Sequence, residues 1–159
     1  MKSLRSRLLL VVVAVVLAAS ACGDDAGDDG TTSAPQSSEP VSNACPDEGC
    51  TITILDVTES GDELEVLWEA NFLPDVSRNH IHIYWDTFQA AEVSSDAEAN
   101  GLTQGDWSPT ADYPTYVTES GASVVNRGDS TTLCVTAADR DHAVLDATAV
   151  DCRDVGSNL

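Results

Sequence analysis

Two of the three histidines in the chain stand two residues apart, in a segment that alternates between apolar and polar side chains. The segment 79–88 reads NHIHIYWDTF. Its period of two is typical of a half-buried strand, with large apolar side chains on one face and His80 and His82 on the other. Two imidazoles on one strand face can bind a single zinc or copper ion, with His142 or Asp86 as a third ligand. The alternative is an ordinary polar strand face whose side chains are hydrogen-bonded to their neighbours.

A second group of candidate ligands lies in the segment 139–147, DRDHAVLDA. Its members are Asp139, Asp141, His142 and Asp146. Carboxylate oxygens in a loop are suitable ligands for calcium. The D-x-D opening is like the start of an EF-hand loop, but Val144 stands where that loop needs glycine and Val150 where it needs glutamate. An EF-hand is therefore excluded, and a calcium site of another kind remains an alternative.

Three aromatic residues lie close together in the segment 105–117, GDWSPTADYPTYV. They are Trp107, Tyr113 and Tyr116. Exposed rings on a proline-rich loop beside acidic residues are suited to stacking against a sugar or a peptide. We therefore predict a surface for a glycan, peptide or protein partner here. The alternative is that the rings fold back and cover an open edge of the fold.

Catalytic motifs are missing from the sequence. It contains no G-x-S-x-G, no H-E-x-x-H and no phosphate-binding loop. Abundant acidic residues do not by themselves define a pair of carboxylates placed for catalysis. We therefore predict that the chain is not an enzyme and carries no cofactor, with a bound divalent metal as the alternative. The net charge of −20 excludes nucleic acid as a partner, because phosphate binding requires a basic patch.

The first 22 residues, MKSLRSRLLLVVVAVVLAASAC, have the parts of an export signal. Three basic residues precede an apolar stretch, 8–19, of 12 residues, which is too short to span a bilayer as a stable helix. Small residues and Cys22 follow. This segment resembles the signal peptide and lipobox of bacterial lipoproteins, although Ala19 replaces the usual leucine. The resemblance implies cleavage before Cys22 and lipidation of its thiol, and ordinary secretion with cleavage near Ala19 or Ala21 is the alternative.

A lipidated amino terminus would determine the cellular location of the protein. Each buried methylene contributes about 0.8 kcal/mol, so two acyl chains give lasting attachment. We expect the protein to be bound to the cell membrane through the Cys22 lipid, with its folded part on the extracytoplasmic face. After cleavage the chain would keep four arginines and all 27 acidic residues, for a net charge of −23.

The composition divides the chain into three parts. Residues 1–21 are the expected signal peptide. Residues 22–44 are rich in Gly, Asp, Ser, Thr and Pro, which predicts a disordered acidic tether. Residues 45–159 are the expected folded domain, long enough for one core.

Four cysteines follow Cys22, and an even number in an exported chain indicates two disulfides. Three pairings are open, and we favour the two local ones, Cys45–Cys50 and Cys134–Cys152. If Cys134 lies opposite Cys152, the two strands form a hairpin with its tip over residues 139–147. A metal cluster of cysteines is excluded because no C-x-x-C spacing occurs.

The folded part contains seven candidate strands and one candidate helix. The strands are expected over 51–57, 64–72, 79–88, 115–118, 122–126, 131–138 and 149–152. A slip in the alternation within the first of them indicates a bulge. The helix is expected over 93–100, with a capping box at Ser95 and Glu98 and a terminating Gly101. The pattern predicts an all-β, immunoglobulin-like antiparallel β-sandwich of about seven strands with one short helix.

The sequence thus favours a lipid-anchored, extracytoplasmic module that binds an unknown ligand through loops at the ends of a rigid sandwich. The alternative is a surface lipoprotein that binds copper or zinc through His80 and His82, or calcium through the loop 139–146. An enzyme of unknown class is the third reading.

Overall fold

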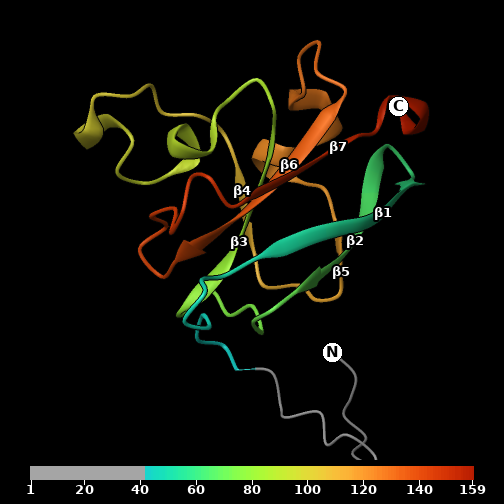
Figure 1. Ribbon diagram of the computed structural model, residues 1–159. Coiled ribbons are helices and arrows are strands. Elements are labelled where there is room, and N and C mark those ends of the chain that lie inside the picture. Colours follow the sequence, from blue (N-terminus) through green and yellow to red (C-terminus); the bar gives the residue numbers. More distant parts are fainter. Residues whose placement is uncertain (1–41) are drawn as a thin grey trace, which may run out of the picture. The chain divides into compact units, whose positions relative to one another are not determined.

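The computed structural model describes residues 42–159 (Figure 1). The expected signal peptide, the expected lipidation site Cys22 and most of the expected tether lie outside the described residues. Within residues 42–159, no helix is long and apolar enough to cross a membrane.

The described part is an all-β sandwich of two antiparallel sheets with seven strands, as predicted (Figure 1). The first sheet has the order β1-β2-β5 and the second the order β4-β3-β6-β7. As in an immunoglobulin-like sandwich, the first and last hairpins lie in opposite sheets, but β4 pairs with β3 in the second sheet and not with β5 in the first. The strands are β1 (Ile52–Ser60), β2 (Glu63–Ala70), β3 (Asn79–Trp85), β4 (Ser108–Thr110), β5 (Thr115–Val117), β6 (Thr132–Asp139) and β7 (Val150–Asp154).

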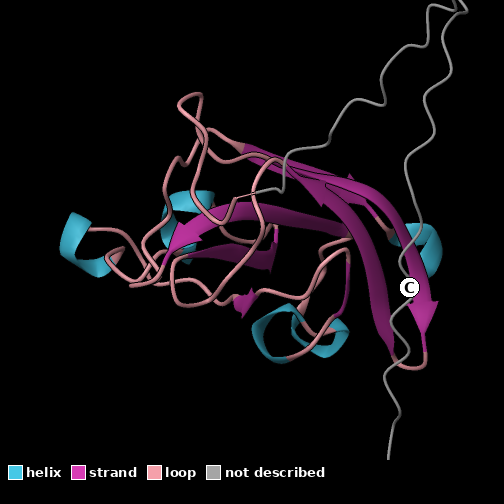
Figure 2. Ribbon diagram, turned by 90° about the horizontal axis from the view of Figure 1, so that it is seen from below, coloured by secondary structure: helices cyan, strands magenta, loops and turns pink. Residues whose placement is uncertain are grey.

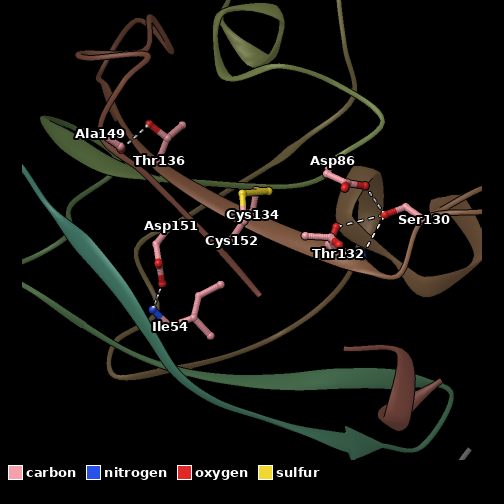
Figure 3. The surroundings of a disulfide bond; sticks show 9 residues. All are labelled: Ile54, Asp86, Ser130, Thr132, Cys134, Thr136, Ala149, Asp151 and Cys152. Carbon is pink, nitrogen blue, oxygen red and sulfur yellow. Dashed lines mark hydrogen bonds between the residues drawn. A yellow bond between two sulfur atoms is a disulfide. The ribbon is translucent and has the colours of Figure 1, made fainter. Parts of the chain in front are cut away.

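The first hairpin, β1–β2, contains the bulge that its sequence predicted. Ile54 pairs with Trp68, and the next paired residue of β1 is Asp56, so Leu55 is the extra residue. The bulge bends β1 at the edge of its sheet, where its backbone meets side chains from β7 of the other sheet. Ile54 N–H donates to the Asp151 carboxylate at 2.7 Å (Figure 3), and Arg153 donates to the carbonyl oxygens of Ile54 and Leu55. These contacts cover an edge that would otherwise be free to pair with another strand.

The main core lies between the two sheets. Alternate residues of β1 and β2 face alternate residues of β3 and β6, and their side chains are almost fully buried. The largest fully buried members are Trp68, Phe72, Leu64, Ile81, Ile83, Trp85 and Leu133. Apolar burial of this extent is the main favourable term in folding.

Strand β3 is buried on both faces, so the prediction of a half-buried strand is wrong. Its outward side chains His80, His82 and Tyr84 are at most 2% exposed. A second apolar cluster lies over this outer face, formed by Tyr84, Cys134, Ala90 and Val93 with Trp107 and others packed against them. The segment 88–107, which we call the covering segment, supplies most of this extra layer and lies beside the second sheet (Figure 1).

The covering segment has two short 3₁₀ turns, η1 (Ala90–Val93) and η2 (Glu98–Asn100), where a helix over 93–100 was expected (Figure 2). The capping box forms one turn earlier, between Gln89 and Glu92. Ser94 is extended, with φ −118° and ψ 141°, because the residues around it bond to the hairpin tip instead of continuing a helix. Gly101 ends η2 with φ 77°, as its position predicted.

The prediction of a strand over residues 122–126 is wrong as well. This segment forms the 3₁₀ turns η3 (Ser120–Ala122) and η4 (Val124–Asn126), and the seventh strand is β4, inside the expected loop. The Glu63 carboxylate accepts hydrogen bonds from the Ser123 hydroxyl and from Val124 N–H, the latter at 3.0 Å. Because Glu63 binds consecutive residues, these bonds favour a turn over an extended strand.

Both predicted disulfides are confirmed, Cys45–Cys50 and Cys134–Cys152. The second joins directly opposed residues of the neighbouring strands β6 and β7 (Figure 3). This register places the hairpin tip over the predicted residues, because β6 ends at Asp139 and β7 begins at Val150.

Candidate metal centre

The three histidines of the chain converge. The Nε2 atoms of His80 and His82 are 3.2 Å apart. Nδ1 of His142 lies 3.0 Å from Nε2 of His80 and 3.4 Å from Nε2 of His82. These three nitrogens form a small triangle, which we call the histidine triangle, between the second sheet and the covering segment. Among residues 42–159, no Cys, Asp or Glu joins them as a further potential ligand.

Strand β3 fixes two corners of the triangle. His80 and His82 point to the same side because they are two residues apart on a strand. Opposite them on β6 stand Ala138 and Thr136, whose side chains are small. The small neighbours leave space above β6 for the third imidazole, which has to enter from outside the sheet.

The tip of the β6–β7 hairpin brings that third imidazole in. The Asp139 carboxylate accepts hydrogen bonds from Asp141 N–H and Ala143 N–H, both at 2.9 Å, and so folds the tip into a compact turn. His142 sits between these donors with φ 63°, a left-handed conformation that is uncommon for residues other than glycine. Strained backbone of this kind occurs frequently at functional sites.

The covering segment holds the hairpin tip from the other side. Ser95 N–H donates to the carbonyl oxygen of His142 at 2.8 Å, and the Ser95 hydroxyl donates to that of Asp141 at 2.6 Å. Val144 N–H donates to the Ser94 hydroxyl at 3.0 Å. The backbone that carries His142 is therefore held by Asp139 within the hairpin tip and by Ser94 and Ser95 of the covering segment, without the help of a ligand.

The tautomer of His82 follows from its environment. Its Nδ1 lies 2.7 Å from the carbonyl oxygen of Val93, which can only accept a hydrogen bond, so Nδ1 carries the proton. Nε2 of the neutral ring is then a bare lone pair that points into the triangle. A backbone carbonyl that orients a ring in this way is a common outer-shell partner of metal-binding histidines.

The triangle is poorly satisfied without a cation. A neutral ring nitrogen is either a donor or an acceptor, so three nitrogens at these distances can form one good hydrogen bond among themselves. The third nitrogen then faces another donor or another acceptor of the same kind and forms no good hydrogen bond with it. On the far side of the ring, Nδ1 of His80 is buried with no partner, a cost that remains whether or not Nε2 binds an ion. A metal ion would accept all three lone pairs at once.

Burial keeps the imidazoles of His80 and His82 neutral. It lowers the pKa of His80 to about 4, with a smaller lowering from His142 and an opposing effect of the Asp139 charge. It lowers the pKa of His82 to about 3, although the hydrogen bond to Val93 raises it. Both rings are thus unprotonated near neutral pH, which is the form that binds metals.

The size of the triangle fits a tetrahedral ion. An ion about 2.0–2.1 Å from each imidazole nitrogen holds tetrahedral ligands about 3.3–3.4 Å apart. The observed separations are 3.0, 3.2 and 3.4 Å, so small movements would complete the geometry. Imidazole is a ligand for zinc, copper, iron and nickel, whereas calcium and magnesium prefer oxygen.

Trp107 forms one wall of the site. Its ring stacks on the His82 imidazole with centroids 5.0 Å apart and planes at 26°. Gly121 makes this position possible, because a Cβ at residue 121 would lie 2.6–2.8 Å from backbone atoms of Trp107. The sequence pointed to Trp107 as a sugar-stacking residue, and no local signal in it predicted contact with His82.

The other candidate ligands do not reach the triangle. Asp86 lies beyond the last residue of β3 and accepts a hydrogen bond from the Ser130 hydroxyl (Figure 3). Asp139 is committed to the backbone of the hairpin tip, and Asp141 pairs with Arg140 at the surface. Asp146 caps its own turn through Thr148. These acids organise the loop and do not converge as a calcium site would require.

The three aromatic rings do not form one surface. Tyr116 is 4% exposed and stacks on Trp68 in the main core, so the expectation of an exposed ring there is wrong. Trp107 is half-buried against His82, and Tyr113 is exposed. Tyr116 thus follows the alternative interpretation, in which the ring folds back onto the sandwich.

The chain matches no protein-family model, and no curated protein or solved structure is significantly similar to it. The functional assignment therefore depends on the geometry of the site.

Proposed function

We propose that this chain is a lipid-anchored, extracytoplasmic protein whose folded domain binds one transition-metal ion through His80, His82 and His142. The observation that carries the proposal is the convergence of three imidazole nitrogens within 3.4 Å of one another. The lipid anchor is a separate part of the proposal and is supported by the basic, apolar and ASAC pattern of residues 1–22.

Three further features support metal binding. The outer-shell bond from His82 to Val93 presets the ligand nitrogen, burial keeps two of the rings neutral, and the left-handed backbone at His142 aims the third ring. A histidine cluster with only a packing role would need none of these. The acidic surface also attracts cations, because the expected mature chain carries a net charge of −23.

Binding is proposed over catalysis because three converging imidazoles form a ligand set and the sequence contains no catalytic motif. One surface cavity is lined by Ser94 and Val144, which join the covering segment to the hairpin tip, but no histidine of the triangle lies in its wall. A site of this kind is suited to capturing, buffering or passing on an ion.

Equilibrium dialysis of the purified, chelator-stripped protein against Zn²⁺ and Cu²⁺ tests the proposal. We expect one ion per chain for the wild-type protein and no stoichiometric binding for His142→Asn. Asp146→Asn is the matched control, because Asp146 lies on the same hairpin tip but outside the triangle. Binding that survives His142→Asn and is lost in Asp146→Asn would place the site in the acidic loop and contradict the proposal.

A further inference from the structure

We infer that the histidine triangle is built for the cuprous ion, Cu(I), in preference to a divalent ion. This inference deepens the proposed function and rests on it. It assigns the ion's charge and oxidation state, neither of which follows from the presence of three histidines alone.

The charge of the site favours a monovalent ion. The ligands of the triangle are three neutral imidazoles, and His80 and His82 are fully buried. The cost of moving an ion from water into a medium of low dielectric rises with the square of its charge, so a divalent ion costs about four times as much as a monovalent one of equal size. A buried site with neutral ligands therefore discriminates in favour of a single positive charge.

A single carboxylate supplies the counter-charge to the triangle. Asp139 is the carboxylate whose field reaches both buried histidines. Its Oδ1 is held by two backbone N–H groups, so it stays in the hairpin tip and acts at a distance. One carboxylate balances one positive charge, whereas a divalent ion would leave an uncompensated charge beneath the covering segment.

The number of ligands in the triangle also favours Cu(I). Divalent zinc takes four ligands, and a site with three histidines needs a water molecule or anion in the fourth position. Cuprous ion has a filled d shell and is satisfied by three donors, and copper accepts imidazole. Here the Trp107 ring stacks on His82, and Val93 belongs to the same apolar layer. These apolar groups restrict solvent access from the side of the covering segment and so disfavour a water ligand there, whereas half-buried His142 lies on the more open side.

The ion enters and leaves this site as Cu(I), and no electron is transferred. The bound ion should also resist oxidation, because Cu(II) prefers a tetragonal set of ligands that three converging imidazoles do not provide. The Trp107 ring, stacked on His82, should slow oxidation further by restricting the access of oxygen. Trp107 is a wall of the site in this account, not a ligand.

Competition titrations under anaerobic conditions test the inference. The chelator-stripped protein competes with bicinchoninate for Cu(I), and separately with a chromophoric zinc chelator for Zn²⁺. We expect the dissociation constant for Cu(I) to be lower than that for Zn²⁺ by more than about tenfold, a free-energy difference of about 1.4 kcal/mol. His142→Asn should lose both ions and Asp146→Asn neither.

The outcomes separate the inference from the proposed function. Zinc binding that is equal, tighter or weaker by tenfold or less overturns the cuprous preference and leaves the metal site standing. If neither ion binds, both the cuprous preference and the proposed metal site are overturned.

Exposure to air gives a second readout. Electron paramagnetic resonance of the Cu(I)-loaded protein should show slow growth of a Cu(II) signal, and faster growth in Trp107→Leu. A full protein-bound Cu(II) signal in wild type as fast as in the variant contradicts the shielding role.

Discussion

His142 is the residue on which the site depends most, because it alone comes from outside strand β3. Its backbone, at φ 63°, is held by the Asp139 carboxylate and by Ser95 N–H. The side chain is half-buried, in contrast to the fully buried His80 and His82. A change at residue 142 can therefore remove a ligand without opening the core.

His142→Asn should separate metal binding from folding. Asparagine tolerates the left-handed conformation, so the metal-free protein should unfold within about 0.5 kcal/mol of wild type. Its shorter side chain cannot place a nitrogen in the triangle. The affinity for metal should fall by more than the roughly 10–100-fold that loss of an outer-shell partner costs. Urea denaturation and isothermal titration measure the two effects, and an unchanged affinity would exclude His142 as a ligand.

Glu63 is a second residue with a defined electrostatic role. Burial raises the pKa of its carboxyl, but hydrogen bonds from Ser123, Thr118 and Val124 outweigh this, so the pKa lies below the usual 4.5. The group therefore stabilises the fold above pH 4.5. That contribution is lost as the pH falls through the lowered pKa.

Glu63→Gln should destabilise the protein in a pH-dependent manner. Weakening of the charge-assisted hydrogen bonds should cost about 1.5 kcal/mol at pH 7. The difference from wild type should shrink at acid pH, where the wild-type carboxyl becomes protonated. Urea denaturation at several pH values checks this, with exposed Glu65→Gln on the same strand as the control. A difference that is constant down to acid pH would contradict the assigned role of the charge.

At the scale of elements, strand β3 shows what the sequence could and could not predict. The H-x-H pattern placed His80 and His82 on one face, because strand periodicity is a local property. The same pattern made that face look exposed, because polar residues on a strand usually face water. Burial comes from the covering segment, whose fold depends on bonds to a hairpin tip almost 50 residues away in sequence, such as Val144 N–H to Ser94.

The errors in secondary structure have the same origin. Ser94 and Ser95 carried a local helix signal, but their polar groups bind the hairpin tip instead. Residues 122–126 had the composition of a strand, but the Glu63 carboxylate holds them as turns. By contrast, both disulfides and the bulge in β1 could be predicted because spacing and alternation are read directly along the chain.

Gly121→Ala tests how closely the turn η3 must approach Trp107. The new Cβ would meet Trp107 backbone atoms at 2.6–2.8 Å and push the two segments apart. We expect a loss of about 1–3 kcal/mol in the free energy of unfolding. Because Trp107 packs on His82, metal affinity should fall as well. Chemical denaturation and metal titration measure both, with Ser120→Ala as the control, and a neutral Gly121→Ala would show that the contact is not constrained.

At the scale of the whole molecule, the disulfides compensate for a modest core. The chain-entropy estimate is about 3 kcal/mol for the Cys134–Cys152 loop and about 2 kcal/mol for Cys45–Cys50. The double variant Cys134→Ala with Cys152→Ala should therefore unfold more readily than the double variant of the shorter pair. Thermal unfolding of the two variants makes the comparison, and the opposite order would contradict it. Cys134 also belongs to the second apolar cluster, so loss of the longer bridge should loosen the layer that covers the histidines.

The proposed lipid anchor is tested separately from the fold. Cys22→Ser should release the protein from the membrane fraction and leave an unprocessed precursor. Fractionation followed by mass measurement of the amino terminus provides the comparison. A normally processed chain that stays with the membrane would contradict lipidation at Cys22.

The central claim is that His80, His82 and His142 bind one metal ion together. X-ray absorption spectroscopy of the protein loaded with one equivalent of zinc tests this most directly. The account predicts three imidazole nitrogens at about 2.0–2.1 Å, with the multiple-scattering pattern of imidazole rings, and two such rings in His142→Asn if any zinc is retained. A shell made of oxygen atoms, or fewer than three imidazoles in the wild-type protein, would contradict it.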